Sequence, residues 1–268
     1  MLKVQPRGPK TIYQVTTEHH ILSKLRQNPN PKLRAQEAIA YGCHKQECYI
    51  LVTGLLGPDL LKLGGDEGKH SARNVLLLAH QGLVLFEQLH AANLVHRDIK
   101  PENLVLGCEG TADARKLHII DFGTCESLVD RNGIRRTQPQ AAEGSVPYMA
   151  VTVHEKQALG KRDDVESLVW TLLRLCLGKL PWEHGKVTPA GIVQVKRRMK
   201  EEGVKAEESC KDMEPYMATC VNKMLAHVQG LKKAESEPDY GALRKHVEAA
   251  WKAGGFAPKD ISKADLSY

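Results

Sequence analysis

Two short stretches decide how this chain folds: HRDIKPEN at residues 96–103 and DFG at residues 121–123. The first follows the apolar pair Leu94-Val95, and the second follows the run KLHII. Short apolar runs bounded by polar residues are typical of buried strands. The sequence therefore predicts two short strands that bracket a loop and present polar side chains at their ends.

The polar residues of these stretches are the ones that phosphoryl transfer requires. That reaction needs a carboxylate to orient the attacking hydroxyl and oxygen ligands for a Mg²⁺ ion that bridges the phosphates. Asp98 has the chemistry for the first role, and Asn103 and Asp121 have it for the second. The combination at this spacing indicates a catalytic site more strongly than any of these residues would alone.

Composition indicates a globular protein of one large domain or two lobes. The chain has 268 residues, 42% hydrophobic and 26% charged. Its apolar runs are far shorter than the roughly 18 residues of a membrane-spanning helix, and residues 1–10 lack the apolar region of a signal peptide. We therefore expect no membrane association. Seven scattered cysteines, an odd number, favour reduced thiols in the cytoplasm or the nucleus.

The net charge of +6 is concentrated at the N-terminus. Residues 1–56 hold eight Lys or Arg and three acids, a balance of +5. Nucleic-acid binding usually requires a continuous basic stripe or a recognised motif. These cations have no such motif and no interleaved aromatic residues. We therefore do not expect a nucleic-acid partner. Salt-dependent binding of a duplex by this region is the least favoured function for the chain.

With Lys100 two residues after Asp98, the two stretches resemble the catalytic and metal-binding loops of eukaryotic Ser/Thr protein kinases. Other segments narrow the resemblance to the casein kinase 1 family, including its tau-tubulin and vaccinia-related relatives. These segments are LLGPDL at 55–60, KRDDVESL at 161–168, LPW at 180–182 and EPDYGALR at 237–244.

This resemblance implies an α+β, two-lobed protein-kinase-like fold. We expect a truncated, β-rich N-lobe at residues 1–56, a mainly helical C-lobe at 57–256 and a C-terminal tail at 257–268. The implied activity is ATP-dependent transfer of the γ-phosphate to Ser or Thr hydroxyls of protein substrates. ATP and Mg²⁺ would be the cofactors, and we expect a monomer.

The resemblance also assigns a nucleotide site in the first half of the chain. Lys3 would grip the α- and β-phosphates, and Glu18, in a helix expected from about Thr17 to Gln27, would be its ion-pair partner. Thr53 would be the gatekeeper. Leu56 would offer hinge backbone groups to adenine, and Val105 would lie beneath the base.

In the large lobe the resemblance assigns the chemistry itself. Asp98, Lys100 and Asn103 would be the catalytic residues, with Asp98 orienting the hydroxyl and Lys100 steadying the γ-phosphate. Asn103 and Asp121 would hold Mg²⁺. Asp164, in a buried helix, would brace the backbone of the catalytic loop.

One element of the kinase pattern is missing from this sequence. A Gly-rich loop joining two strands normally precedes the lysine strand, but only Met1 and Leu2 precede Lys3. The lysine strand would then be an exposed sheet edge. We favour an incomplete copy of a longer kinase. The alternative is a pseudokinase or truncated kinase that binds proteins as a scaffold without turnover.

Two further segments carry expectations of their own. VKRRMK at 195–200 is expected to be a solvated helix face, with docking of an acidic substrate or a nuclear address as alternatives. GSVPYMA at 144–150 resembles the substrate-side segment of the family, but Pro147 stands where many members have an arginine, so recognition of phosphate-primed substrates is not expected. Thr137 and Ser145 are candidate phosphorylation sites.

Overall fold

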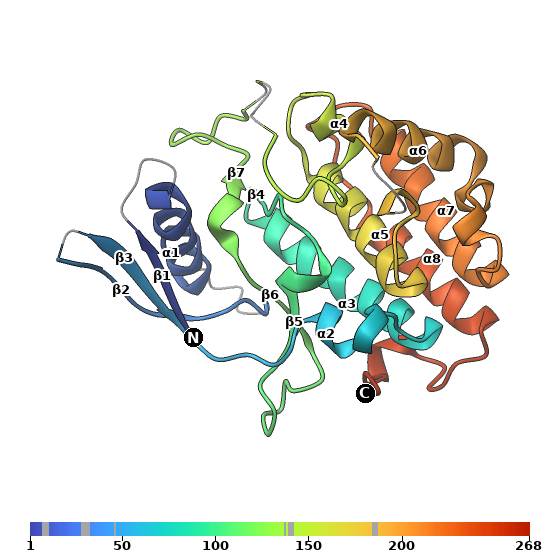
Figure 1. Cartoon of the computed structure of the whole chain (residues 1–268), viewed down its shortest axis with the longest axis horizontal. Helices are drawn as coiled ribbons and strands as arrows, with labels where there is room; N and C mark the ends of the chain where they lie inside the picture. Colours follow the sequence, from blue (N-terminus) through green and yellow to red (C-terminus); the bar gives the residue numbers. More distant parts are fainter. Residues whose placement is uncertain (7–10, 28–32, 46, 137, 139–141, 184–186) are drawn as a thin grey trace.

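The computed structural model describes residues 1–6, 11–27, 33–45, 47–136, 138, 142–183 and 187–268. These residues form a small lobe of one sheet and one helix beside a larger, mainly helical lobe (Figure 1). The predicted α+β, two-lobed fold is confirmed.

The small lobe contains an antiparallel three-stranded sheet in the order β1-β3-β2. Strand β1 (Leu2–Pro6) pairs along its length with β3 (Cys48–Thr53), which forms a hairpin with β2 (Ala38–His44). In the described part of the sheet, β1 is therefore an edge strand, as expected. Lys3 lies opposite Leu51 in this register.

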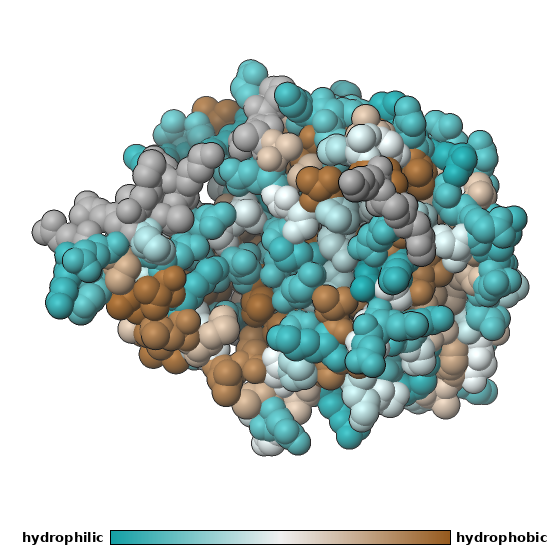
Figure 2. All heavy atoms as spheres, viewed as in Figure 1, coloured by the Kyte–Doolittle hydropathy of each residue, from teal (hydrophilic) through white to brown (hydrophobic). Residues whose placement is uncertain are grey.

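The two faces of this sheet differ. Lys3 on β1 points towards the helix of the small lobe, whereas its neighbours Leu2 and Val4 are 62% and 50% exposed. Ile39 on the neighbouring β2 is also exposed. Figure 2 shows apolar residues gathered over the strands of the small lobe. The lysine thus lies on the inner face of the sheet.

Helix α1 (Thr11–Gln27) covers the inner face and begins six residues before the predicted start. Residues 11–17 include several β-branched side chains, whose helix propensity is modest. Val15, Glu18 and Leu22 are nevertheless buried at helical spacing. Packing of this buried face therefore supports the helix where local propensity is modest.

The large lobe is built around α5 (Lys161–Leu177), which is buried along nearly its whole length, as the sequence predicts. The other helices are α2 (Leu60–Leu63), α3 (Ala72–Ala91), α4 (Val151–His154), α6 (Pro189–Glu202), α7 (Pro215–Gly230) and α8 (Tyr240–Ala253). Short strands form two antiparallel pairs, β4 (Leu94–Val95) with β7 (Glu126–Ser127) and β5 (Leu104–Leu106) with β6 (Leu117–Ile119). No helix among the described residues is long and apolar enough to cross a membrane.

Residues 257–268, expected as a tail, pack onto α3. Ile261 and Leu266 are 3% and 1% exposed and belong to the same core as the helices. The Asn74 amide donates a 2.7 Å hydrogen bond to the carbonyl of Ser267. The C-terminal segment is therefore integrated into the packing of the large lobe.

Candidate active site

The β5–β6 pair brings Asn103 and Asp121 to the same end of the large lobe. Leu104 lies opposite Ile119, and the Ile120 N–H donates a 3.0 Å hydrogen bond to the Asn103 carbonyl. Asn103 thus immediately precedes one strand, and Asp121 closely follows the other. This antiparallel register places the two predicted metal ligands close to each other.

The Asp98 carboxylate is held by donors from three residues. Its Oδ1 accepts the Ser145 N–H at 2.8 Å. Its Oδ2 accepts the Asn103 amide at 3.0 Å and lies 2.8 Å from the Lys100 ammonium. Because both oxygens are engaged, the orientation of this carboxylate is fixed. The structure therefore brings the three predicted catalytic residues into direct contact.

The donor set at Asn103 and Asp121 fits Mg²⁺. The Asn103 amide nitrogen donates to both the carbonyl and the carboxylate of Asp98, which leaves its amide oxygen as the atom that can bind a cation. Carboxylate and amide oxygens are hard ligands of the kind that suits Mg²⁺. No cluster of three or more His, Cys, Asp or Glu in the described chain could hold a metal, so the candidate site depends on this amide–carboxylate pair.

Lys3 joins the two lobes. Its ammonium lies 2.7 Å from Glu18 Oε2 on α1 and 2.7 Å from Asp121 Oδ1 in the large lobe. Burial alone would lower the pKa of Lys3, but the two carboxylates outweigh it and raise the pKa. At Asp121, burial would raise the pKa, but the charge and hydrogen bond of Lys3 lower it. The predicted Lys3–Glu18 pair is present and continues to Asp121.

The pKa of Glu18 shifts in the opposite direction from that of Asp121. Glu18 is only 2% exposed, and its burial raises its pKa despite the adjacent ammonium of Lys3. Asp121 is the more exposed acid, with 43% of its side chain accessible. The ammonium therefore lies between an enclosed carboxylate and one that opens towards solvent.

The residues expected around adenine lie at the end of β3, in the linker that follows it and on β5. Thr53 ends β3 and is 2% exposed, with no hydrogen-bond partner described for its hydroxyl. Leu56 is half-buried in the linker that follows. The next residue, Gly57, donates to the Leu106 carbonyl at 2.9 Å, which brings the linker beside Val105 on β5.

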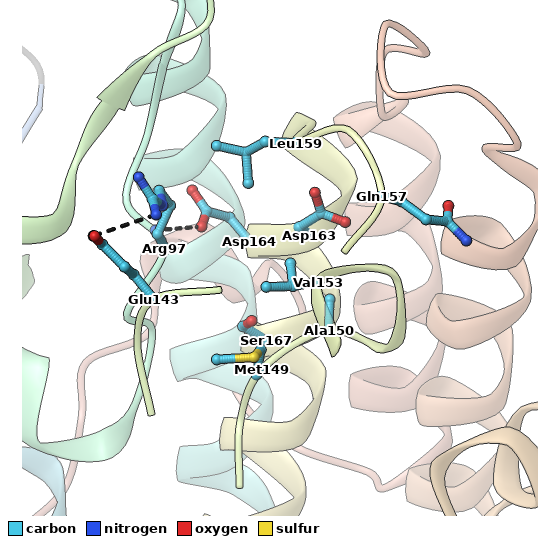
Figure 3. Close-up of a pocket in the computed structure, with 10 residues that line it drawn as sticks. All are labelled: Arg97, Glu143, Met149, Ala150, Val153, Gln157, Leu159, Asp163, Asp164 and Ser167. Carbon is cyan, nitrogen blue, oxygen red and sulfur yellow. Dashed lines mark hydrogen bonds and ion pairs between the residues drawn. The ribbon is translucent and has the colours of Figure 1, made fainter. Parts of the chain in front are cut away.

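Asp164 at the start of α5 contacts the catalytic-loop backbone as predicted. One oxygen accepts the N–H of His96 at 2.6 Å. The other accepts the N–H of Arg97 at 2.9 Å (Figure 3). Burial alone would raise the pKa of Asp164. Its hydrogen bonds with the His90 side chain and the His96 backbone lower this pKa. Arg97 has a φ of 73°, an unfavourable value for this residue type. The Asp164 hydrogen bonds hold the loop in that conformation.

The two loops also meet inside the core. The His96 and Phe122 side chains are fully buried, and their rings pack edge to face with centroids 5.2 Å apart. His96 Nε2 is 3.0 Å from the Ile120 carbonyl. These contacts fix the position of the HRD loop relative to DFG without placing either ring where a substrate would bind.

Ser145, which the sequence suggested as a phosphorylation site, is part of the hydrogen-bond network around Asp98. Besides its N–H bond to Asp98, its hydroxyl accepts a 2.9 Å hydrogen bond from Lys100. The adjacent Gly144 has a φ of 104°, and a Cβ there would lie 2.2 Å from the Arg97 carbonyl. In the sequence, Gly144 next to Ser145 is the signal that could have indicated the close approach of this backbone to Arg97. Thr137 lies outside the described residues.

A small cavity lies between the catalytic loop, residues 143–159 and α5. The Arg97 guanidinium, 3.2 Å from Glu143, borders it together with Asp163 and Ser167 of α5 (Figure 3). Its volume of about 20 Å³ suffices for about one water molecule. This cavity is therefore too small for a substrate or nucleotide.

Comparison with known proteins identifies the family. The protein kinase domain profile matches residues 1–231, and the chain therefore belongs to the protein kinase domain family. Among its relatives, casein kinase I homolog 1 of Saccharomyces cerevisiae is 32% identical over 203 residues, covering 73% of this chain and 36% of that protein.

Two other relatives give the same result. Casein kinase I homolog 2 of Schizosaccharomyces pombe is 30% identical over 210 residues, 77% of this chain and 47% of that protein. Casein kinase 1-like protein HD16 of Oryza sativa is 33% identical over 156 residues, 56% of this chain and 22% of that protein. The predicted casein kinase 1 resemblance is confirmed. The chain spans less than half the length of these relatives.

Proposed function

We propose that this chain is a protein Ser/Thr kinase of the casein kinase 1 type, which transfers the γ-phosphate of ATP to hydroxyls of protein substrates. The observation that carries this proposal is the immobilised Asp98 carboxylate. Ser145, Lys100 and Asn103 hold it beside the candidate metal ligands. A carboxylate so held is suited to orienting an incoming alcohol.

Asn103 and Asp121 would hold Mg²⁺ at the end of the β5–β6 pair. When bound, Mg²⁺ neutralises charge on the phosphates during transfer. Lys3, anchored by Glu18, would bind the α- and β-phosphates, since its ammonium already lies against Asp121. The linker at Leu56 would offer backbone groups to adenine.

Adenine would lie between Thr53 at the end of β3 and Val105 on β5. We also propose a reducing compartment, the cytoplasm or the nucleus, because seven scattered cysteines, an odd number, favour reduced thiols.

In the reaction, the substrate hydroxyl oxygen forms a bond to the γ-phosphorus, and the bond from that phosphorus to the bridging oxygen of ADP breaks. Asp98 orients the hydroxyl and accepts its proton. Lys100 stabilises the transferred group by its positive charge, while Ser145 keeps the ammonium in place. ADP and the phosphorylated protein are the products.

A phosphotransfer assay tests this proposal. With radiolabelled ATP, Mg²⁺ and an acidic protein such as casein, we expect transfer that falls at least about 100-fold in Asp98→Asn. The exposed Asp212 provides a matched control, and Asp212→Asn should retain activity. If wild type and Asp98→Asn both incorporated only background levels of radiolabelled phosphate, the proposed kinase activity would be rejected.

Thermal unfolding with Mg–ATP separates the kinase from the scaffold alternative. A ligand that binds only the folded state raises the melting temperature. Stabilisation by Mg–ATP accompanied by transfer supports the kinase. Stabilisation without transfer to any protein would instead indicate a nucleotide-binding scaffold.

A further inference from the structure

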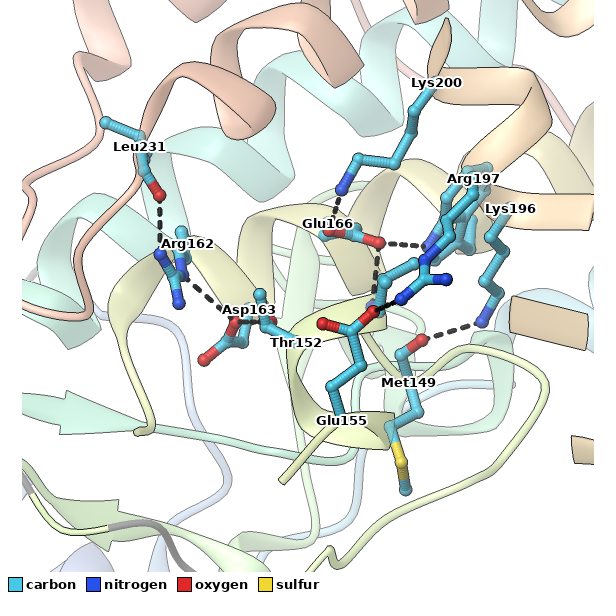
Figure 4. Close-up of polar contacts among 12 residues, drawn as sticks. Met149, Thr152, Glu155, Arg162, Asp163, Glu166, Lys196, Arg197, Lys200 and Leu231 are labelled. Atoms are coloured by element: carbon cyan, nitrogen blue, oxygen red, sulfur yellow. Dashed lines mark hydrogen bonds and ion pairs between the residues drawn. The ribbon is translucent and has the colours of Figure 1, made fainter. Parts of the chain in front are cut away.

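Only part of VKRRMK is the solvated helix face that the sequence predicted: Arg197 and Arg198 are exposed, but Lys196 is not. Lys196 on α6 is fully buried, and its ammonium donates a 2.7 Å hydrogen bond to the Met149 carbonyl (Figure 4). The ammonium also lies 4.8 Å from the ring centroid of Trp182 and 5.5 Å from that of Trp170. This lysine is therefore enclosed and unavailable to an acidic substrate or a nuclear import receptor.

A buried glutamate holds the chain at Val151, two residues after the Met149 carbonyl that Lys196 contacts. Glu166 on α5 is 1% exposed, and its Oε1 accepts the N–H of Val151 at 3.0 Å. The same oxygen accepts the Trp170 indole N–H at 3.2 Å, while Oε2 lies 2.8 Å from the Lys200 ammonium. Both carboxylate oxygens thus have donors, as a buried charge requires.

A third side chain completes the pattern. The Trp182 indole N–H donates to the Pro147 carbonyl at 3.1 Å. Main-chain groups of residues 147, 149 and 151 are therefore each held by a side chain of the large lobe. At the other end, Ser145 is bonded to Asp98. The segment is fixed at alternate residues, starting at the catalytic carboxylate.

The buried lysine is costly enough to need a reason. Moving an ammonium out of water is unfavourable unless hydrogen bonds and charges compensate. Burial lowers the pKa of Lys196 to about 7, which Glu166 opposes and Lys200 reinforces. The amine and the ammonium both carry N–H donors. The hydrogen bond to Met149 can therefore form in either protonation state.

We propose that Lys196 and Glu166 are positioning residues that hold residues 147–151 against the catalytic loop, so that the substrate chain beside the acceptor hydroxyl docks on a fixed main chain. The docking part of this inference rests on the proposed kinase function. The hydrogen bonds act on main-chain groups, so they hold the path of the segment independently of its side chains. A displaced segment would also pull the Ser145 N–H away from Asp98.

Lys196→Met tests the inference, because methionine fills similar space and donates no hydrogen bond. We expect the KM for the protein substrate to rise about tenfold, equivalent to about 1.4 kcal/mol, with the KM for ATP unchanged. Amide hydrogen exchange at residues 148–151 should accelerate, while the Mg–ATP thermal shift should stay the same. Arg198→Met removes a cation two residues along the same helix that pairs with Glu207 instead, and should leave all four values unchanged.

Trp182→Phe is a second variant: it keeps an aromatic ring beside Lys196 but loses the indole N–H bond to Pro147, and it should also accelerate exchange in the segment. Unchanged exchange in both variants would overturn the inference, as would an equal rise in the KM values for ATP and protein. Exchange needs no turnover. Faster exchange in Lys196→Met, combined with a wild type that phosphorylates nothing, would therefore reject the kinase function but support the anchoring of the segment.

Discussion

Lys3 and Asp121 are 118 positions apart in the sequence, yet Nζ of the first lies 2.7 Å from Oδ1 of the second. Because Lys3 is on an edge strand of the small lobe and Asp121 follows β6, this ion pair crosses between the lobes. Glu18 holds the lysine from the other side. The Lys3 ammonium therefore links the relative position of the lobes to the charge of Asp121, the candidate metal ligand.

Replacing Lys3 by methionine should abolish this link without unfolding the chain. The strand keeps its backbone pairing, but Asp121 and the buried Glu18 lose their counter-charge. We expect phosphotransfer to fall by about 100-fold and the Mg–ATP thermal shift to shrink. Lys45→Met, an exposed lysine in the β2–β3 turn, is the matched control. Full activity in Lys3→Met would show that Lys3 is not part of the nucleotide site.

Loss of the Asp164 carboxylate should destabilise the protein. Asp164→Ala leaves the buried N–H groups of His96 and Arg97 without their acceptor and relaxes the positive φ of Arg97. We expect the free energy of unfolding in urea to fall by about 3 kcal/mol. The exposed Asp212 is the comparison, and Asp212→Ala should change stability little. A loss as small as that of the control would show that the loop does not depend on Asp164.

Gly144 and Gly133 form a matched pair for testing close approach to the catalytic loop. Both have positive φ, at 104° and 77°, but a Cβ on Gly144 would lie 2.2 Å from the Arg97 carbonyl, whereas one on Gly133 would meet nothing within 4 Å. Alanine strains the backbone at both positions by about 1 kcal/mol. Only Gly144→Ala should also displace Ser145 from Asp98, and we expect about 100-fold lower turnover. Equal turnover in the two variants would contradict this.

Lys196 should make stability depend on pH. Its pKa is lowered to about 7 in the folded chain, against an ordinary value of 10.5. Between these two values the unfolded chain binds more protons at this site, so the stability contributed by this group rises with pH. Across that window, the free energy of unfolding of wild type minus that of Lys196→Met should increase. A flat difference would indicate that burial does not perturb this amine.

The sequence predicted well which residues lie together at the candidate site, because these residues lie in short contiguous motifs. Asp98, Lys100 and Asn103 fall within six positions, and the apolar runs beside them form the strands that set their geometry. Asp121 follows from the same pairing. Where one local stretch carries both the chemistry and the strand pattern, a single sequence suffices to place a site.

The buried cations could not be predicted in the same way. In VKRRMK, Lys196 has the composition of a surface residue, and only packing brings the Trp170 and Trp182 rings and the Met149 carbonyl around it. Those partners are 14 to 47 positions away. Hydropathy predicts that every lysine is exposed to solvent. It therefore fails for Lys196, whose burial depends on residues that are distant in the sequence.

Holding residues 147–151 by their carbonyls and amides has an evolutionary consequence. Val146 beside this segment is 39% exposed, and none of the three anchoring bonds involves its side chain. Under the proposed kinase function, mutations at this position would alter which neighbouring amino acid of the substrate is accepted while the geometry around Asp98 is preserved. On that proposal, preference for target sequences would diverge in such a lineage without repeated loss and recovery of chemical competence.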